Sequence, residues 1–427
     1  MPSSLSQFLV FIGRALRTAT TTMTGTTTTS GINPSPGTNT AIIADRVADL
    51  GLNDVSDDEC PSPMTAFDIV VVGAGGGPDE SNLSAYLLKS HTARWEDGVL
   101  ALEAGSGQGT LARILKEKPD LFRDPDGESD QVKNQALTAS DIYNSIQGFL
   151  ITHAHMDHIM SLVISAGSLS GCRKRIYAVK QTLKDIESSV FNDRAWPNLA
   201  SWREDDASYK FLYSPLTPNT TTYEPVSSEF SVATFPLNHG SNDLGPYESV
   251  AYFVRQDASG QEFLFFGDVE PDSVASLNGG KPQTLAVWQF AAPKIPHMLS
   301  TIFIECSYPS GRADSLLFGH LTPEYLVEEL VALAAEVRKS KPAGHSSDRP
   351  NKHVRKRQKR LASSTGITNA LAGLTVYVTH CKDAGLGDES SGRPMREVIV
   401  EQVRSLAEAK GLGVTIKAAE QGMHIQI

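Results

Sequence analysis

The chain has little cysteine, no long hydrophobic run and no excess of positive charge, and each absence excludes a class of protein. It has four cysteines, Cys60, Cys172, Cys306 and Cys381. They form no C-x-x-C pair and are too few for a disulfide framework, which favours a reducing compartment, the cytoplasm first. No stretch of about 18 consecutive apolar residues exists, so no membrane-spanning helix and no membrane partner are expected. Lys plus Arg number 38 against 49 Asp plus Glu, and this net charge of −11 excludes a wholly basic nucleic-acid binder.

The charge is unevenly distributed along the chain. Residues 338–360 hold ten Lys and Arg residues and one acid, which leaves 28 basic and 48 acidic residues elsewhere. The polar segment 338–370 separates a helical pattern from an apolar strand pattern, and we interpret it as a basic disordered insert. Its KHVRKRQKR run is typical of a nuclear import signal or a docking element. It lacks the interleaved aromatic residues of a single-strand nucleic-acid groove.

The first residues differ in composition from the rest of the chain. Residues 1–65 include a Thr-rich tract punctuated by Pro and Gly, so they are predicted to form a disordered tail, and residues 66–427 a single folded domain. Residues 1–44 contain two arginines and no acid, as mitochondrial presequences do. A plain unstructured tail is the alternative interpretation.

Apolar runs and helical periodicity alternate through the predicted domain and indicate an α/β fold with helices covering the sheets. The run FDIVVVG at 67–73 reads as a buried strand followed by a glycine-rich turn. This turn does not match a dinucleotide-binding loop, because Pro78 stands where the third glycine would be. Further strands are predicted at 99–105, 148–152, 175–179, 209–213, 230–237, 248–255, 262–268, 300–306 and 374–380. Helices are predicted at 109–117, 157–169, 322–339 and 394–410.

The segment FLITHAHMDHIMSL carries the clearest chemical signal. An apolar strand leads into His153 and His155, whose alternation places both rings on one side. Asp157 and His158 follow at once and open an apolar helix. Adjacent residues point apart, so Asp157 and His158 suit a second ion beside the first. Four nitrogen and carboxylate donors within six residues indicate a metal site, whereas a lone histidine would more often be structural.

Other strand ends offer the remaining donors. His239, Asp268 and His380 each follow a β-rich run, where open α/β sheets place functional residues.

The order of these residues resembles the metallo-β-lactamase superfamily, whose pattern is H-x-H-x-D-H followed by a His, an Asp and a His. The segments FDIVVVGAGGGPDESNLSAYLL, IECSYP and FGHLTPEYLVEEL narrow the resemblance to the class II cyclic-nucleotide phosphodiesterases. It covers 67–427 apart from the insert. Met156, Glu103 and the pair Ala166-Gly167 depart from the family pattern, which usually has Leu, Asp and Ser followed by Ala or Pro there. None of these residues is an expected ligand.

The resemblance implies a metallo-β-lactamase-like αββα sandwich with two divalent metal ions, of which zinc fits best and manganese or iron remain open. One ion would be held by His153, His155, His239 and Asp268. The other would be held by Asp157, His158, Asp268 and His380, with Asp268 bridging.

His320 in FGHLTP is the candidate general acid, with Glu305 in IECSYP orienting it. The alternative is that both are structural, at a helix start and a strand end. With Asp268, they complete the predicted catalytic set.

The expected function is hydrolysis of 3′,5′-cyclic nucleotides, cAMP first and cGMP second, to 5′-nucleotides, which lowers cyclic-nucleotide signalling. The expected partner is this small molecule rather than nucleic acid, and a homodimer stays open. The rival enzyme is a tRNA 3′-end endonuclease or another hydrolase of the superfamily. The non-enzyme rival is a scaffold that docks partners through the insert.

Overall fold

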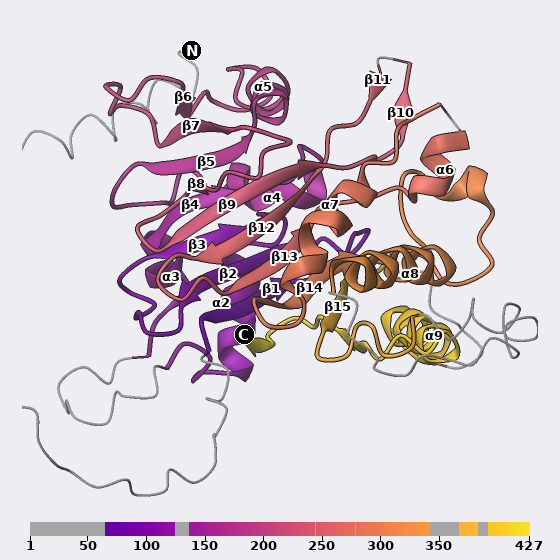
Figure 1. The fold of residues 1–427 in the computed structure, drawn as a ribbon. Coiled ribbons are helices and arrows are strands. Elements are labelled where there is room, and N and C mark those ends of the chain that lie inside the picture. Colours follow the sequence, from indigo (N-terminus) through magenta and orange to yellow (C-terminus); the bar gives the residue numbers. More distant parts are fainter. Residues whose placement is uncertain (1–64, 124–135, 244, 278, 342–366, 383–391) are drawn as a thin grey trace, which may run out of the picture. The chain divides into compact units, whose positions relative to one another are not determined.

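The computed structural model describes residues 65–123, 136–243, 245–277, 279–341, 367–382 and 392–427 (Figure 1). The predicted N-terminal tail, apart from its last residue, and most of the predicted basic insert lie outside the described residues, so the domain boundaries remain predictions. No helix in the described ranges combines the length and apolar character needed to cross a membrane.

The first sheet has eight strands in the order β17-β1-β2-β3-β4-β5-β7-β6. Its members are β1 (Phe67–Gly73), β2 (Ala85–Ser90), β3 (Val99–Leu102), β4 (Ile146–Leu150), β5 (Lys174–Val179), β6 (Ala200–Ser201), β7 (Phe211–Leu216) and β17 (His424–Gln426). The run from β3 through β4 and β5 to β7 is parallel, so the carboxyl ends of these strands share one edge.

The second sheet has seven strands in the order β16-β15-β14-β13-β12-β9-β8. Its members are β8 (Glu224–Pro225), β9 (Phe230–Pro236), β12 (Val250–Gln256), β13 (Glu262–Phe266), β14 (Leu299–Glu305), β15 (Thr375–Thr379) and β16 (Thr415–Ala418). The strands from β13 to β16 are parallel. A separate two-stranded ribbon joins β10 (Ser241–Asn242) to β11 (Gly245–Pro246).

Helices cover the outer face of each sheet, as Figure 1 shows. A core of residues from both sheets, including Phe67, Tyr86, Tyr252 and Phe303, fills the space between them. On the first sheet lie α2 (Gln108–Glu117), α3 (Ala139–Ser145), α4 (Met156–Ser165) and α5 (Lys180–Ser189). On the second lie α7 (Thr284–Ala291), α8 (Pro323–Ser340) and α9 (Met395–Ala409), with the short α6 (Asp272–Leu277) beside α7. These layers confirm the predicted αββα sandwich.

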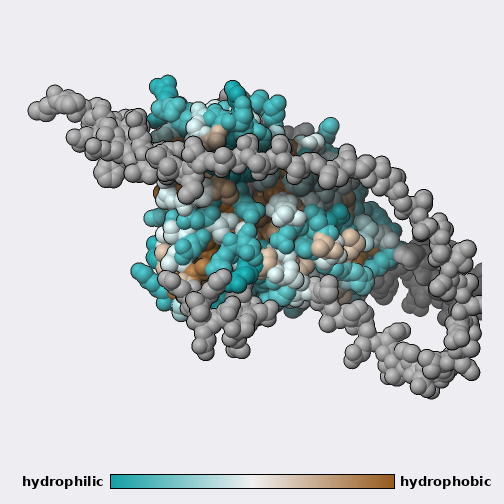
Figure 2. Space-filling model, turned by 90° about the vertical axis from the view of Figure 1, so that its left-hand side faces the viewer, coloured by the Kyte–Doolittle hydropathy of each residue, from teal (hydrophilic) through white to brown (hydrophobic). Residues whose placement is uncertain are grey.

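The layers follow from the sequence pattern. The strand FDIVVVG is buried along its whole length, because one set of alternate side chains faces the helices and the other faces the second sheet. Helix α8 buries Leu326, Leu330, Leu333 and Val337 on one stripe at helical spacing. Hydrophilic side chains dominate the coloured surface in Figure 2.

A buried glutamate ties α8 to the segment that follows Asp268. Glu329 accepts hydrogen bonds from the Trp288 indole at 2.8 Å and from the backbone N–H of Asp272 at 3.1 Å. Burial raises the pKa of Glu329 to about 7 from its ordinary 4.5, with the nearby Asp272 carboxylate adding to the shift. The stability that protonated Glu329 contributes is therefore complete below pH 4.5 and is lost as the pH rises through about 7.

We expect Glu329→Gln to flatten this pH dependence. Because glutamine stays neutral, the variant avoids the cost of ionising a buried group, on the order of 3 kcal/mol for a shift of this size. It loses one acceptor at all pH values, so it should be less stable than the parent at pH 5 and recover toward it at pH 8. Urea unfolding at both pH values measures this, with Glu324→Gln on the exposed face of α8 as the control. Equal pH dependence in Glu329→Gln and the parent chain would contradict the expectation.

Candidate metal centre

All the histidines and acids predicted as metal ligands lie at the carboxyl ends of strands or just beyond them. Strand β4 ends at Leu150, and the chain then leads through His153 into α4, whose N-cap is His155. The other donors come from the second sheet, where His239 follows β9, Asp268 follows β13 and His380 follows β15. The two facing sheets thus bring their strand ends to one place.

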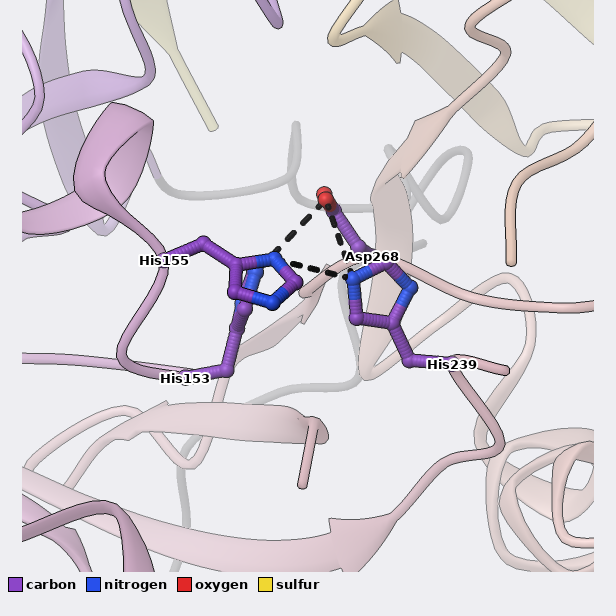
Figure 3. Close-up of side chains that lie close together, drawn as sticks. All are labelled: His153, His155, His239 and Asp268. Atoms are coloured by element: carbon purple, nitrogen blue, oxygen red, sulfur yellow. Dashed lines mark hydrogen bonds and ion pairs between the residues drawn. The ribbon is translucent and has the colours of Figure 1, made fainter. Parts of the chain in front are cut away.

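The first group comprises His153, His155, His239 and Asp268, whose side chains point toward one another (Figure 3). Asp268 Oδ2 lies 3.6 Å from Nε2 of His153 and 3.6 Å from Nε2 of His239. His155 Nδ1 lies 3.2 Å from His239 Nε2. The group's donor atoms all lie within 4.8 Å of one another.

The second group comprises Asp157, His158, Asp268 and His380. Asp268 Oδ1 lies 3.4 Å from Nε2 of His158 and 3.3 Å from Nε2 of His380. The Nε2 atom of His380 also lies 3.1 Å from Asp157 Oδ2. Asp268 therefore presents one carboxylate oxygen to each group.

The hydrogen bonds of the imidazoles leave donor atoms directed into the groups. His239 donates from Nδ1 to the carbonyl of Gly319 at 2.9 Å, which leaves the lone pair on Nε2. His153 Nδ1 lies 3.0 Å from the Thr152 hydroxyl, and its buried Nε2 has no hydrogen-bond partner among the described residues. Metal-binding histidines are commonly held in this way, so the donor set fits a divalent metal.

The ionisation states of His239, His153 and Asp268 also suit metal binding. Burial lowers the pKa of His239 to about 4 and holds the pKa of His153 well below its ordinary value, so both imidazoles are neutral at neutral pH. Burial opposes the charge on Asp268, but the surrounding histidines, His380 and His158 first, hold its pKa well below the ordinary value. Neutral imidazole and ionised carboxylate are the forms that coordinate metals.

Backbone strain gathers around these groups. Glu103 and His380 have positive φ angles of 59° and 58°, which cost about 1–3 kcal/mol each for residues other than glycine. The buried Glu103 accepts from the backbone N–H of Thr152 at 3.2 Å, and its other oxygen lies 3.5 Å from His158 Nδ1. Glycine is required at position 76, in the turn after β1, because a Cβ there would lie 2.3 Å from the His380 ring. These constraints fix the orientation of two predicted ligands.

The predicted catalytic pair lies beside both groups, because the His320 ring is 5.1 Å from that of His239 and 5.2 Å from that of His380. His320 Nδ1 donates to Glu305 Oε1 at 2.8 Å and lies 3.7 Å from Asp268 Oδ2. Burial opposes a charged imidazole, but the Glu305 carboxylate raises the pKa of His320 above its ordinary value. Glu305, His320 and His380 could also hold a metal by their spacing, so geometry alone permits a ligand role for His320.

Sequence reasoning missed the residue that joins this pair to the ligands. The Ser307 hydroxyl donates to Glu305 Oε2 at 2.8 Å and lies 3.0 Å from His380 Nδ1. Ser307 is fully buried, two residues after Glu305 in the IECSYP segment. Its position beside a strand-end acid was the available signal, although its partner His380 lies 73 residues away.

Comparison with known proteins identifies a family model for class-II cAMP phosphodiesterases that matches residues 122–422. A 3′,5′-cyclic-nucleotide phosphodiesterase of Aliivibrio fischeri is 35% identical over 273 residues, which cover 63% of this chain and 76% of the relative. An enzyme of the same name from Schizosaccharomyces pombe is 30% identical over 366 residues, covering 84% of this chain and 92% of the relative.

The fold also matches a solved structure. The crystal structure of unliganded yeast PDE1 superposes with a TM-score of 0.66 at 26% sequence identity. The match covers 84% of this chain and 99% of the yeast chain. The similarity therefore extends over almost the whole of that protein.

Proposed function

The chain belongs to the class-II cAMP phosphodiesterase family, and from this membership we propose that it hydrolyses 3′,5′-cyclic nucleotides to 5′-nucleotides. We take cAMP as the first substrate and cGMP as the second. The observation that supports this activity best is the pair of donor groups sharing Asp268, with His320 beside them. A hydrolase that acts on a phosphodiester needs positive charge at the phosphoryl oxygens and a proton for the leaving oxygen.

Two metal ions are part of the proposal. His153, His155, His239 and Asp268 would hold one ion, and Asp157, His158, Asp268 and His380 the other. Zinc suits imidazole and carboxylate donors, with manganese and iron as the alternatives. When bound, such ions stabilise charge on phosphoryl oxygens and lower the pKa of a water molecule.

Protonation of the leaving oxygen is assigned to His320. Hydrolysis joins a water oxygen to phosphorus and breaks the bond between phosphorus and O3′, which must gain a proton. Because Glu305 accepts the proton on Nδ1 of His320, the proton available for transfer lies on Nε2. Ser307 fixes the second oxygen of Glu305, so the carboxylate cannot turn away from His320.

The buried donor groups also account for an anionic substrate in an acidic chain. The first group contains three histidines and one aspartate, and the second contains two histidines and two aspartates, with Asp268 common to both. Two divalent cations would exceed the charge of Asp157 and Asp268 and leave the centre positive. A monoanionic cyclic phosphate would then be attracted locally.

The test is turnover of cAMP and cGMP by the purified chain, with and without a zinc chelator, and identification of the product. We expect a 5′-nucleotide, a loss of at least about 100-fold on removing the metal, and recovery on adding zinc. A parallel assay with precursor tRNA tests the nuclease alternative. Turnover that survives complete metal removal, a 3′-nucleotide product, or cleavage of tRNA in place of cyclic nucleotides would reject the proposal.

A further inference from the structure

Large apolar side chains are exposed beside the metal centre. Among the described residues, Met156, Tyr247 and Phe318 are 49%, 40% and 66% exposed. Met156 stands between two predicted ligands, and Phe318 stands two residues before His320. Exposed apolar residues that gather around a polar site indicate a surface that binds a ligand with an apolar face.

Tyr247 packs on the edge of the first ligand group. Its ring centroid lies 5.1 Å from that of His155 and 6.1 Å from that of His239. Its backbone N–H donates to the carbonyl of Gly240 at 3.1 Å, so the segment after the β10–β11 ribbon is fixed to the loop that carries His239. Tyr247 is thereby placed at the mouth of the site, with its ring still partly open to solvent.

Phe318 has an unfavourable backbone conformation, although its side chain is not buried. Its φ angle is +51°, in the left-handed region that bulky residues avoid. The next residue, Gly319, has φ +81°, and a Cβ there would lie 2.6 Å from the carbonyl oxygen of His239. The tight Gly319 contact and the buried Leu317 fix the backbone on both sides, while the Phe318 ring remains exposed.

The two aromatic residues flank one loop. Tyr247 donates to Gly240, and a Cβ built on Gly240 would lie 3.4 Å from Gly319 Cα and 4.0 Å from the carbonyl carbon of Phe318. Gly240 directly follows His239, so both aromatic residues belong to the rim of the first ligand group. They come from different segments, and no ring contact joins them within the described part of the chain.

We propose that Tyr247 and Phe318 bind the nucleobase of the substrate by stacking, while its cyclic phosphate lies at the metal centre. This inference rests on the proposed function and adds the residues that recognise the base. The base projects away from the phosphate through the ribose, so a phosphate at the centre places the base at the rim. Stacking on an aromatic side chain contributes about 1–3 kcal/mol per base and tolerates any base, because every base has a π-face. The rim therefore accepts adenine and guanine alike.

The test compares Phe318→Ala and Tyr247→Ala on three substrates: cAMP, cGMP and ribose 3′,5′-cyclic phosphate, which has no base. We expect kcat/KM for both cyclic nucleotides, relative to that of the base-free phosphate, to fall about 10-fold in each variant. The ratio between cAMP and cGMP should stay constant, and metal content should match that of the parent chain. Phe318→Trp and Tyr247→Phe keep an aromatic face, so they should retain the parent chain's preference for cyclic nucleotides over the base-free phosphate.

Trp202→Ala is the matched control, since Trp202 is an exposed aromatic residue that packs on Tyr213 away from the metal ligands. Thermal unfolding of each variant identifies misfolding, and Tyr247 tests the proposal independently of the strained Phe318. Unchanged discrimination in both folded variants, or an equal loss on the base-free phosphate, would overturn the inference and leave the proposed function intact. If the parent chain hydrolyses no cyclic nucleotide, the proposed function fails and the inference fails with it.

Discussion

Replacing Asp268 with Asn is expected to reduce cyclic-nucleotide turnover by about 10³-fold or more and to reduce the metal that the purified chain retains. Asp268 offers one oxygen to His153 and His239 and the other to His158 and His380. Asparagine keeps the shape but removes the charge and converts one of the two donors into an amide N–H₂ group. Losing about 4 kcal/mol of metal-derived stabilisation of the transition state corresponds to this factor.

Metal analysis by mass spectrometry and turnover of cAMP measure the two effects on the same sample. Asp205→Asn is the matched control, because Asp205 is exposed and pairs with Arg203, two residues before it. The control should keep both metal content and turnover. A folded Asp268→Asn variant with full metal content would remove Asp268 from the proposed ligands, even if its turnover were lost.

The positions of the predicted ligands in the fold could be inferred from the sequence, because each of them follows a strand with a clear apolar pattern. His153 and His155 are separated by one residue and lie past a strand of apolar residues, so local alternation already predicts that they converge. Asp268 and His380 come from parallel neighbours of β14, whose carboxyl ends must meet at one edge. For these residues, position along a strand is enough to predict position in the fold.

Other features depend on contacts that no local pattern encodes. The strand predicted at 209–213 is displaced to Phe211–Leu216, past Pro215. Strand β6 pairs with β7 only at Phe211 and Leu212, so Pro215 needs no partner on that side and its missing N–H has no cost. Ser307 and Tyr247 acquire their positions from residues far away in the sequence or on another loop.

The predicted helix at 157–169 also ends early, at Ser165. The apolar pattern continues to Leu169, which is buried, but Gly167 follows directly after the C-cap Ala166. Glycine weakens a helix interior. The backbone N–H groups of Ser168 and Leu169 both donate to the carbonyl of Ser165, which forms a closing turn. The buried Leu169 therefore reflects core packing rather than continued helix.

The His320→Ala variant is expected to keep its metal content and to lose about 10²–10⁴-fold in kcat for cyclic nucleotides, the usual contribution of a positioned acid. His320 is buried beside Asp268, and Glu305 holds its Nδ1 proton, which leaves Nε2 as the site that serves the leaving oxygen. Glu305→Gln should produce a smaller loss of the same kind, because glutamine can still accept from Nδ1 but does not stabilise a charged imidazole.

A substrate that needs no acid separates proton transfer from a general loss of the site. A p-nitrophenolate leaving group departs from a phosphodiester without protonation. Turnover of such a substrate should therefore fall far less in His320→Ala than that of cAMP. His297→Ala, which changes an exposed histidine after the α7 region, is the control and should affect neither substrate. Because Glu305, His320 and His380 could themselves hold an ion, metal content decides between two roles for His320. Loss of metal with equal losses on both substrates would make His320 a ligand, and the proton for O3′ would then have to come from another group.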